Sequence, residues 1–362
     1  MILSVADDFT GAAEVAGVAW RFGLQAEVMT RLPATLSKSP EKMVAGDADS
    51  RTEDVGQSAE MWRKWIKFAE EIEADLFFKK TDSVLRGHVG EELRACLQSG
   101  QWSRALLVPA NPDRGRTICE GLYRLKGKPL DETEFSRDPE FPCRSALVTE
   151  TVKGASSVKA GEDFSASEIT VGDAEKTEDL IQWAHCVDDD ILPAGASPFF
   201  AELLRARGYC ERRQGETIDI RNRPAWLVSG SRSEQALATT ARLEASGGLV
   251  IDADQGSGKH EVREDEEMVI FRQPRKLSAD SPAELTERLA ILLGSVLRHR
   301  KGSLPHLYLE GGETAAAILT KLNRTCFSVV CEWEPGVVTL ESEGLFATVK
   351  PGSYPWPTPF FS

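Results

Sequence analysis

Short apolar segments alternate with stretches of helical periodicity along most of the chain. Segments 2–6, 26–29, 76–78 and 105–108 have the length of strands, whereas residues 10–22 and 58–72 repeat apolar side chains at helical spacing. Regular alternation of strand and helix favours a sheet of mainly parallel strands. The sequence therefore predicts an α/β fold.

The length of 362 residues is more than one ordinary hydrophobic core organises. A charged, turn-rich stretch at 211–223 separates two halves, and the second half repeats the pattern with strands at 225–228, 248–251, 306–309 and 327–331. We therefore expect two domains, residues 1–222 and 223–362. Each would be a mainly parallel sheet flanked by helices, with an interdomain cleft.

Composition excludes several classes of protein. The net charge of −14 argues against a nucleic-acid partner, because binding a phosphate backbone needs a concentrated basic face. No apolar run approaches the roughly 18 residues of a membrane span, and no signal peptide precedes the first strand, so we expect a cytoplasmic protein without a membrane partner. Seven scattered cysteines and five histidines lack metal-binding spacings, which predicts reduced, mostly buried thiols and no metal ligated by the protein.

The first strand runs into Asp7-Asp8-Phe9-Thr10-Gly11, at the kind of strand end where open α/β sheets bind ligands. Two adjacent carboxylates repel each other and need a cation or hydrogen-bond donors nearby. They could bind substrate hydroxyls, bind a metal or accept a proton. Equally, Asp8 or Thr10 could cap the following helix. The residues alone leave these interpretations open.

A second polar cluster follows the strand at 76–78. It contains Lys79, Lys80, Thr81, Asp82 and Ser83, with Arg86 three residues later. Paired cations and hydroxyls suit a ligand with a carboxylate and several hydroxyl groups. The alternative is a solvated loop with internal ion pairs. Two weaker clusters, 47–51 and 113–117, follow other strands of this half.

The second half instead has turns rich in Gly and Ser at its strand ends: 229–231, 310–314, 334–336 and 350–353. Glycine at a strand-to-helix turn lets backbone N–H groups approach an anion. One such turn is weak support, because glycine is common in turns for conformational reasons, but four favour a nucleotide. Gly256-Ser257-Gly258-Lys259 imitates part of a P-loop but lacks the other residues of that motif.

Seven motifs follow one another along the chain: Asp7-Asp8-Phe9-Thr10-Gly11, Asp49-Ser50-Arg51, Lys80-Thr81-Asp82-Ser83-Val84-Leu85-Arg86-Gly87, Gly115-Arg116-Thr117, Ser229-Gly230-Ser231, Gly311-Gly312-Glu313-Thr314-Ala315 and Glu334-Pro335-Gly336. Together they resemble the four-carbon acid sugar kinases, a family first catalogued as a domain of unknown function. The resemblance covers nearly the whole chain. One departure is Ala12-Ala13-Glu14, where the family usually has Ala-Asn-Asp.

The resemblance implies an N-terminal sugar-acid-binding domain and a C-terminal nucleotide-binding domain that uses ATP and Mg²⁺. Such a kinase phosphorylates the terminal hydroxyl of a threonate, erythronate or 3-oxo-tetronate type of acid. Residues implied on the sugar-acid side are Asp7, Asp8, Thr10, Gly11, Asp49, Ser50, Arg51, Lys80, Thr81, Asp82, Ser83 and Arg86. Residues implied on the ATP side are Ser229, Gly230, Ser231, Gly311, Gly312, Glu313, Thr314, Glu334, Gly336 and Gly352.

The mechanistic hypothesis is in-line phosphoryl transfer, in which Asp8 or Asp82 orients or deprotonates the hydroxyl while Lys80 and Arg86 hold the substrate carboxylate. One alternative is a sugar-acid lyase or epimerase with Asp82 and Lys80 as acid and base. Another is a non-catalytic sensor of a sugar acid or nucleotide. The sequence is compatible with a homodimer but does not decide the oligomeric state.

Overall fold

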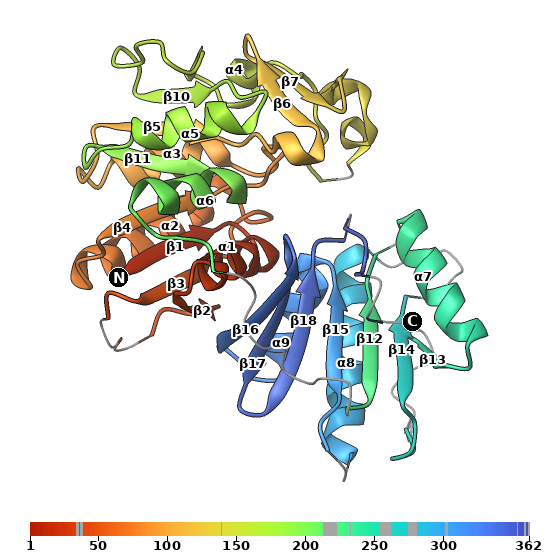
Figure 1. The fold of residues 1–362 in the computed structure, drawn as a ribbon. Coiled ribbons are helices and arrows are strands. Elements are labelled where there is room, and N and C mark those ends of the chain that lie inside the picture. Colours follow the sequence, from red (N-terminus) through yellow and green to blue (C-terminus); the bar gives the residue numbers. More distant parts are fainter. Residues whose placement is uncertain are drawn as a thin grey trace. The chain divides into compact units, whose positions relative to one another are not determined.

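The computed structural model describes residues 1–33, 36, 39–138, 140–212, 223–231, 233–253, 262–273, 281–300, 303–352, 354–357 and 360. The chain forms two compact units (Figure 1). Unit 1 comprises residues 1–25 and 29–212, and unit 2 comprises residues 26–28 and the chain from 213 onward. The stretch before the expected boundary at 222 and the P-loop-like residues 256–259 lie outside the described residues.

Unit 1 is built on a parallel sheet. Its strand order is β3 (Lys42–Asp47), β1 (Ile2–Ala6), β4 (Leu76–Lys80), β11 (Ile191–Gly195), β5 (Arg104–Val108), β10 (Ile169–Gly172) and β9 (Ser156–Val158). Each neighbouring pair is parallel, as the alternation of strand and helix predicted. A further strand, β2 (Gln25–Met29), contributes its central residues to unit 2.

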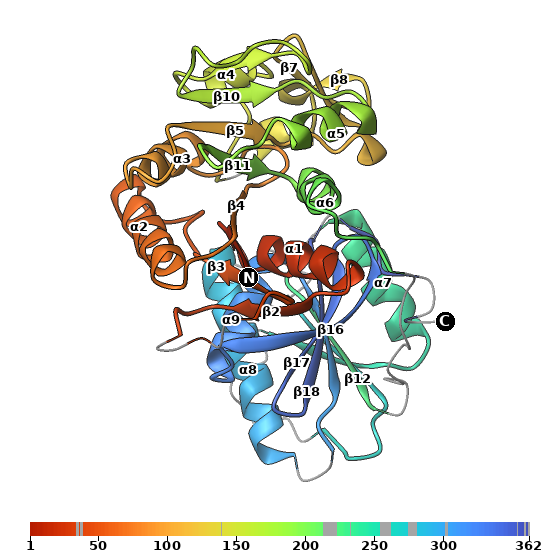
Figure 2. The same cartoon turned by 60° about the vertical axis from the view of Figure 1, so that its left-hand side comes forward.

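Helices cover both faces of this sheet (Figure 2). Their bounds are α1 (Phe9–Arg21), α2 (Val55–Glu71), α3 (Val89–Leu97), α4 (Val148–Thr151), α5 (Thr177–His185) and α6 (Ser197–Ala206). Because successive side chains of a strand point to opposite faces, neighbouring residues of β4 join different cores. Phe77 packs in the cluster that contains Trp62 of α2, whereas the ring of Phe78 contacts Phe199 and Phe200 of α6. Trp62 and Trp65, which belong to the apolar stripe at 58–72, are core residues.

A small antiparallel sheet follows β5 in the chain. It consists of β6 (Arg116–Cys119), β7 (Leu122–Leu125) and β8 (Lys128–Pro129), and short 3₁₀ turns flank it: η1 (Pro112–Arg114), η2 (Leu130–Glu132) and η3 (Glu134–Arg137). Residues 126–145 contain β8, η2 and η3, and among the described residues of this stretch only Leu130 is buried. The chain turns tightly at Lys126 and Gly127, which both have positive φ.

Unit 2 contains a mixed sheet. The strand order is β13 (Leu249–Asp252), β14 (Met268–Arg272), β12 (Ala225–Ser229), β15 (His306–Glu310), β18 (Leu345–Lys350), β17 (Val337–Ser342) and β16 (Cys326–Glu334). The first five strands are mutually parallel, whereas β17 and β16 form an antiparallel meander with β18. The helices are α7 (Glu234–Ala245), α8 (Pro282–His299) and α9 (Gly312–Lys321).

The cysteine side chains are less buried than expected. All seven thiols are free, but only Cys96 and Cys331 are buried, and Cys210 and Cys326 are exposed. The expectation of mostly buried thiols was therefore wrong, because several cysteines lie at the ends of elements, where composition does not report burial. Within the described residues, no helix is long and apolar enough to cross a membrane.

Candidate functional site

The carboxyl ends of the unit 1 strands bring the predicted clusters together. Ala6, the last residue of β1, is in register with Asp47 of β3 on one side and with Lys80 of β4 on the other. The segments that follow these three strands therefore leave the sheet at the same edge. They are the segments at 7–11, 48–51 and 81–87 that the sequence singled out.

Asp8 both caps a helix and pairs with a cation. It is the N-cap of α1, where its Oδ1 accepts a hydrogen bond from the N–H of Gly11 at 2.7 Å and its Oδ2 accepts from Thr10 Oγ1 at 2.9 Å. A Cβ at Gly11 would lie 2.7 Å from Asp8 Oδ1, so glycine is required for this close approach. The same Oδ2 accepts from Arg51 Nη1 at 2.8 Å. Helix capping by Asp8 and a role of Asp8 in ligand binding are therefore compatible.

Arg51 is the central cation of the cluster. Its Nε and Nη2 form a two-pronged contact with the two carboxylate oxygens of Asp7, at 2.7 and 3.0 Å. The backbone N–H groups of Ser50 and Arg51 donate to the carbonyl of Asp7, which fixes the turn that carries Arg51. Burial disfavours the Asp8 carboxylate anion, but Arg51 and Lys80 outweigh that cost and lower the pKa of Asp8.

Asp82 is bound by Arg86 in the same two-pronged way. Arg86 Nη2 and Nε reach Asp82 Oδ1 and Oδ2 at 2.8 and 3.1 Å, and the N–H groups of Val84 and Arg86 donate to Oδ2. Despite the opposing effect of burial, these contacts hold the pKa of Asp82 far below its ordinary range. Arg86 also lies 3.5 Å from Asp138. The Asp82 carboxylate is therefore ionised at neutral pH and is held in a fixed orientation by Arg86.

The two adjacent lysines of β4 point to opposite faces of the sheet. Lys80 Nζ lies 3.2 Å from Glu14 of α1, and Glu14 accepts a hydrogen bond from Ser197 of α6. Lys79 is fully buried on the other face, where its Nζ donates to Glu92 of α3 at 2.7 Å and lies 4.1 Å from the centre of the Trp62 ring. The sequence grouped both cations with a ligand, but Lys79 belongs to the core.

Glu92 is the structurally important residue that the sequence did not indicate. Besides Lys79, it accepts hydrogen bonds from Ser50 at 2.8 Å and Ser58 at 2.9 Å. Ser50 Oγ in turn accepts from Trp62 Nε1 at 3.0 Å. Ser50 was predicted to contact substrate, but its side chain is completely buried in this network, where it fastens the turn between Asp49 and Arg51. An acidic residue in an otherwise apolar helix stripe was the only signal available.

Asp47 and Asp49 give this edge an excess of negative charge. Buried Asp47 accepts a hydrogen bond from the N–H of Asp49 at 2.9 Å, and burial followed by repulsion from Asp49 and Asp8 raises its pKa well above the ordinary value. Asp49 is exposed and has a positive φ of 49°. Burial of part of its carboxylate and the charge of Asp8 raise its pKa as well. The carboxylates here suit hydroxyl donors better than a second anion.

The loop after β4 contacts the small sheet of unit 1. Arg116 of β6 donates to Ser83 Oγ, and Tyr123 of β7 donates to the carbonyl oxygen of Ser83. Thr81 is completely buried, and its hydroxyl has no hydrogen-bond partner among the described residues. Of the weaker cluster at 113–117, Arg116 thus lies beside the predicted sugar-acid residues.

In unit 2, the Gly- and Ser-rich turns also gather at one sheet edge. Ser229, Glu310 and Lys350 are in register as the last residues of β12, β15 and β18. The strand β17 runs antiparallel to β18, with Val338 opposite Val349, so the hairpin turn at 334–336 reaches the same edge. All four turns predicted to bind nucleotide therefore lie along this edge.

Close approach to a neighbouring element explains one of the glycines, and a positive φ explains another. A Cβ at Gly230 would lie 1.9 Å from Thr314 Oγ1, so only glycine lets the β12–α7 turn approach the first turn of α9. Gly311 precedes α9 with a φ of 99°. It has no side chain with which to cap α9, so the first N–H groups of that helix are suited to an anion. Gly336 donates to Glu332 Oε1, whereas Glu313 and Glu334 are exposed.

Two cations along this edge form ion pairs that were not predicted. Lys350 pairs with Glu310, both are almost completely buried, and Glu310 accepts from Ser229 Oγ at 2.6 Å. Arg272, at the end of β14, pairs with Asp252 at 2.8 Å and with Glu244 at 2.9 Å. The sequence signal for these ion pairs was a charged residue at the end of an apolar strand, which is too common to be specific.

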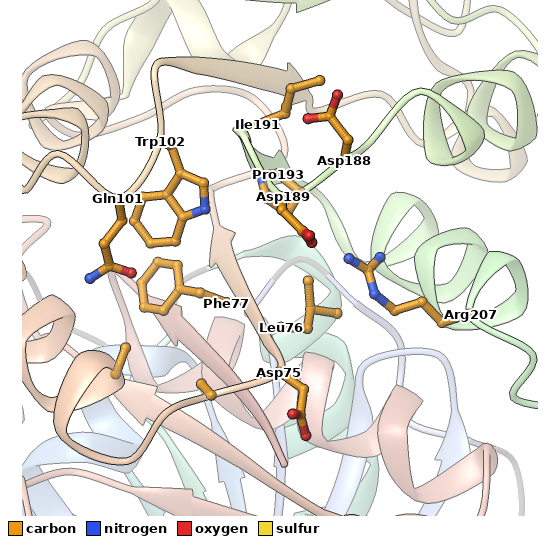
Figure 3. Close-up of a pocket in the computed structure, with 12 residues that line it drawn as sticks. Asp75, Leu76, Phe77, Gln101, Trp102, Asp188, Asp189, Ile191, Pro193 and Arg207 are labelled. Carbon is orange, nitrogen blue, oxygen red and sulfur yellow. The ribbon is translucent and has the colours of Figure 1, made fainter.

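A separate pocket of about 300 Å³ lies at the opposite edge of the unit 1 sheet (Figure 3). Its walls include Leu76 and Ile191, the first residues of β4 and β11, together with Trp102 and Arg207. Ligands of open α/β sheets bind at the carboxyl ends of the strands. We therefore place the candidate site at the edge that carries Asp8, Arg51 and Asp82, away from this pocket.

The chain is a two-unit α/β protein in which each unit carries polar residues at the carboxyl ends of its parallel strands. Residues 2–203 match the model of the sugar-binding N-terminal domain family, and the chain belongs to that family. It is 26% identical over 402 residues to a D-threonate kinase of Salmonella typhimurium, covering 98% of this chain and 95% of the relative. It is 25% identical over 410 residues to a 3-oxo-tetronate kinase of Methylobacterium radiotolerans, covering 97% and 95%.

A protein of Salmonella typhimurium with a solved structure has the same fold. The TM-score is 0.78 at 17% sequence identity, and the likeness covers 98% of this chain and 96% of that one. The mainly parallel α/β architecture expected from the sequence is thereby confirmed.

Proposed function

We propose that the chain is an ATP-dependent kinase that phosphorylates the terminal hydroxyl of a four-carbon sugar acid of the threonate, erythronate or 3-oxo-tetronate type. The observation that carries the proposal is the similarity to a D-threonate kinase. That similarity extends through both units, whereas the sugar-binding family match covers residues 2–203. The expected sugar-acid residues gather at one sheet edge of unit 1, and the expected ATP residues gather at one edge of unit 2.

On the sugar-acid side, Asp8 and Asp82 are the carboxylates that we assign to the reacting hydroxyl. Both have lowered pKa values, so each would accept a hydrogen bond from that hydroxyl and orient it rather than take up a proton early. This suits phosphoryl transfer, whose loose transition state depends more on positioning and charge than on a strong base. Arg51 and Arg86 hold the two carboxylates in place.

On the ATP side, the N-terminus of α9 with Gly311, Gly312 and Thr314 would hold phosphates through backbone N–H groups. The uncapped first turn of α9 and the glycine-only contact between Gly230 and Thr314 fit such a role. Ser229, Ser231 and Gly352 line the neighbouring turns, and Gly352 approaches both Ser231 and Gly311. Mg²⁺ bound with the phosphates would neutralise their charge.

The lyase or epimerase alternative fits the geometry less well. It needs Asp82 and Lys80 as acid and base, yet Asp82 is fixed by Arg86 and Lys80 lies against Glu14. Lys80 is also predicted to stay charged, because Glu14 and Asp8 outweigh its burial and raise its pKa. An ionised, fully paired acid–base couple is poorly placed to exchange protons near neutral pH.

A coupled ADP-release assay over a panel of tetronates tests the proposal. We expect ADP only when both ATP and a sugar acid are present. Conversion of the acid without ATP would support the lyase or epimerase, and ligand binding without turnover would support a sensor. Light scattering measures the oligomeric state.

A further inference from the structure

The cations at the ligand edge of unit 1 differ in whether the protein neutralises them. Arg51 contacts Asp7 and Asp8, Arg86 contacts Asp82, and Lys80 contacts Glu14. Arg116 is the exception, since it forms no ion pair with any residue in the described part of the chain. Its one side-chain hydrogen bond, from Nη1, goes to the uncharged hydroxyl of Ser83.

Arg116 is also well buried. The residue is 8% exposed, and its Nε is a buried donor without a partner in the described residues. Removing a guanidinium from water without a counter-charge is unfavourable, so buried arginines normally have an acidic partner. Arg116, a buried arginine without an acidic partner among the described residues, is therefore suited to bind an anion from outside the chain.

The fold holds Arg116 rigidly in this position. Its backbone N–H and carbonyl both pair with Asn111, and the following β6–β7 hairpin places it opposite Leu125. The hydroxyl of Tyr123 donates to the carbonyl oxygens of Ser83 and Pro109, which ties the hairpin to the loop after β4. Arg116 and the loop at 81–87 are therefore fixed relative to each other.

We propose that Arg116 binds the carboxylate of the sugar acid and thereby selects acids over neutral sugars. With Nη1 engaged by Ser83, Nε and Nη2 remain as the two parallel donors that a guanidinium offers to a carboxylate. The assignment rests on the proposed function and names the group that unit 1 recognises. It replaces the expectation that Lys80 and Arg86 hold the carboxylate, since the protein already neutralises both.

The test compares an acid with its neutral analogue. Calorimetric titration with a tetronate and with the four-carbon polyol that lacks the carboxylate is carried out on the wild type, R116M and R116K. We expect R116M to weaken tetronate binding by about 30-fold or more, the lower end for loss of a buried charged contact, and to leave polyol affinity unchanged. R116K should recover only part of the loss, because an ammonium lacks the planar fork.

The matched control is R124M, on the neighbouring strand of the same hairpin. Arg124 is in register with Thr117, so its side chain lies on the opposite face of the hairpin from Arg116. R124M should bind both ligands as the wild type does. Thermal unfolding should show R116M to be at least as stable as the wild type, because the substitution removes a buried charge that lacks a partner.

Two results would overturn the proposal. One is unchanged tetronate affinity in R116M, and the other is an equal loss of affinity for the tetronate and the polyol. If R116M does not fold, the same comparison in R116K decides. A wild type that binds tetronate but releases no ADP would refute the kinase and leave the role of Arg116 standing, so the two failures are distinguishable.

Discussion

At the scale of single residues, the ligand edge of unit 1 is organised by what each charge already contacts. Asp8 has one oxygen on the N-terminus of α1 and the other on Thr10 and Arg51. Asp82 is occupied by Arg86 and two backbone N–H groups. A carboxylate held so tightly has a fixed direction, which is what positioning a hydroxyl requires.

The substitution Asp8→Asn separates the two roles of Asp8. Asparagine caps a helix about as well as aspartate, so stability should change by less than about 1 kcal/mol. The charge that faces Arg51 and the hydroxyl is lost, so we expect turnover to fall by about 10²-fold or more while ATP affinity stays the same. Steady-state kinetics and ATP titration measure these two quantities.

Asp54→Asn is the matched control for this substitution. Asp54 caps α2 through the N–H groups of Gly56 and Gln57 and is exposed. It should retain the turnover of the wild type. If Asp8→Asn and Asp54→Asn behave alike, Asp8 is only a helix cap.

At the scale of elements, β4 separates ligand chemistry from core stability by simple alternation. Lys80 faces α1 and α6, whereas Lys79 faces α2 and α3, where Glu92 joins it to Ser50, Ser58 and Trp62. This buried network fastens the turn that presents Arg51. A charge in the core of unit 1 thus supports the geometry of its ligand edge.

Breaking this buried pair should destabilise the protein strongly. Lys79→Met leaves Glu92 charged and unpaired, which we expect to cost about 3–5 kcal/mol of unfolding free energy. The double substitution Lys79→Met with Glu92→Leu removes both charges and should recover much of that loss. Urea unfolding followed by tryptophan fluorescence measures both variants, and additive losses would contradict the pairing.

Lys67→Met is the control, because the Lys67–Glu71 pair on α2 is exposed and its loss should change the free energy of unfolding little.

The buried Lys79–Glu92 pair also predicts that stability depends on pH. Burial opposes ionisation of Glu92, but Lys79 and the hydroxyl donors lower its pKa below the ordinary 4.5. Its stabilising contribution is therefore present above about pH 4.5 and is lost as the pH falls through the lowered value. The double variant should lack that part of the acid sensitivity.

At the scale of the whole molecule, each unit carries its own polar edge at the carboxyl ends of parallel strands. Unit 1 gathers carboxylates and guanidinium groups, whereas unit 2 gathers glycine-rich turns and a helix N-terminus. We propose that this division separates recognition of the acid from recognition of ATP. Damage to one edge should then leave binding at the other intact.

Gly230→Ala tests this division. The added methyl group would overlap Thr314 and force the β12–α7 turn away from α9. We expect ATP affinity to fall by about tenfold or more, about 1.4 kcal/mol, with sugar-acid affinity unchanged. Gly294→Ala in α8 is the control, because its nearest neighbours lie at ordinary contact distances of 3.6 and 3.7 Å. Calorimetric titration of both ligands measures the outcome, and a parallel loss of both affinities would contradict the division.

The sequence by itself predicted the α/β class, most strands and helices, and the segments that meet at the two edges. Those features depend on local periodicity and on the residue types in turns, which can be read from the amino-acid sequence. It did not predict that the small sheet packs against the loop after β4, or which residue pairs with Lys79, because both depend on contacts between different elements of the fold. Lys79 to Glu92 and Ser83 to Arg116 are such contacts.

What only the tertiary structure decided is which charges the protein itself neutralises. Lys79, Lys80, Arg51, Arg86 and Arg116 look alike in the sequence as cations beside polar motifs. Folding gives the first four a carboxylate, whereas the partner of Arg116 within the described residues is a hydroxyl. Because the free energy of a buried charge depends on its partner and its distance from water, that distinction arises only when strands and helices pack.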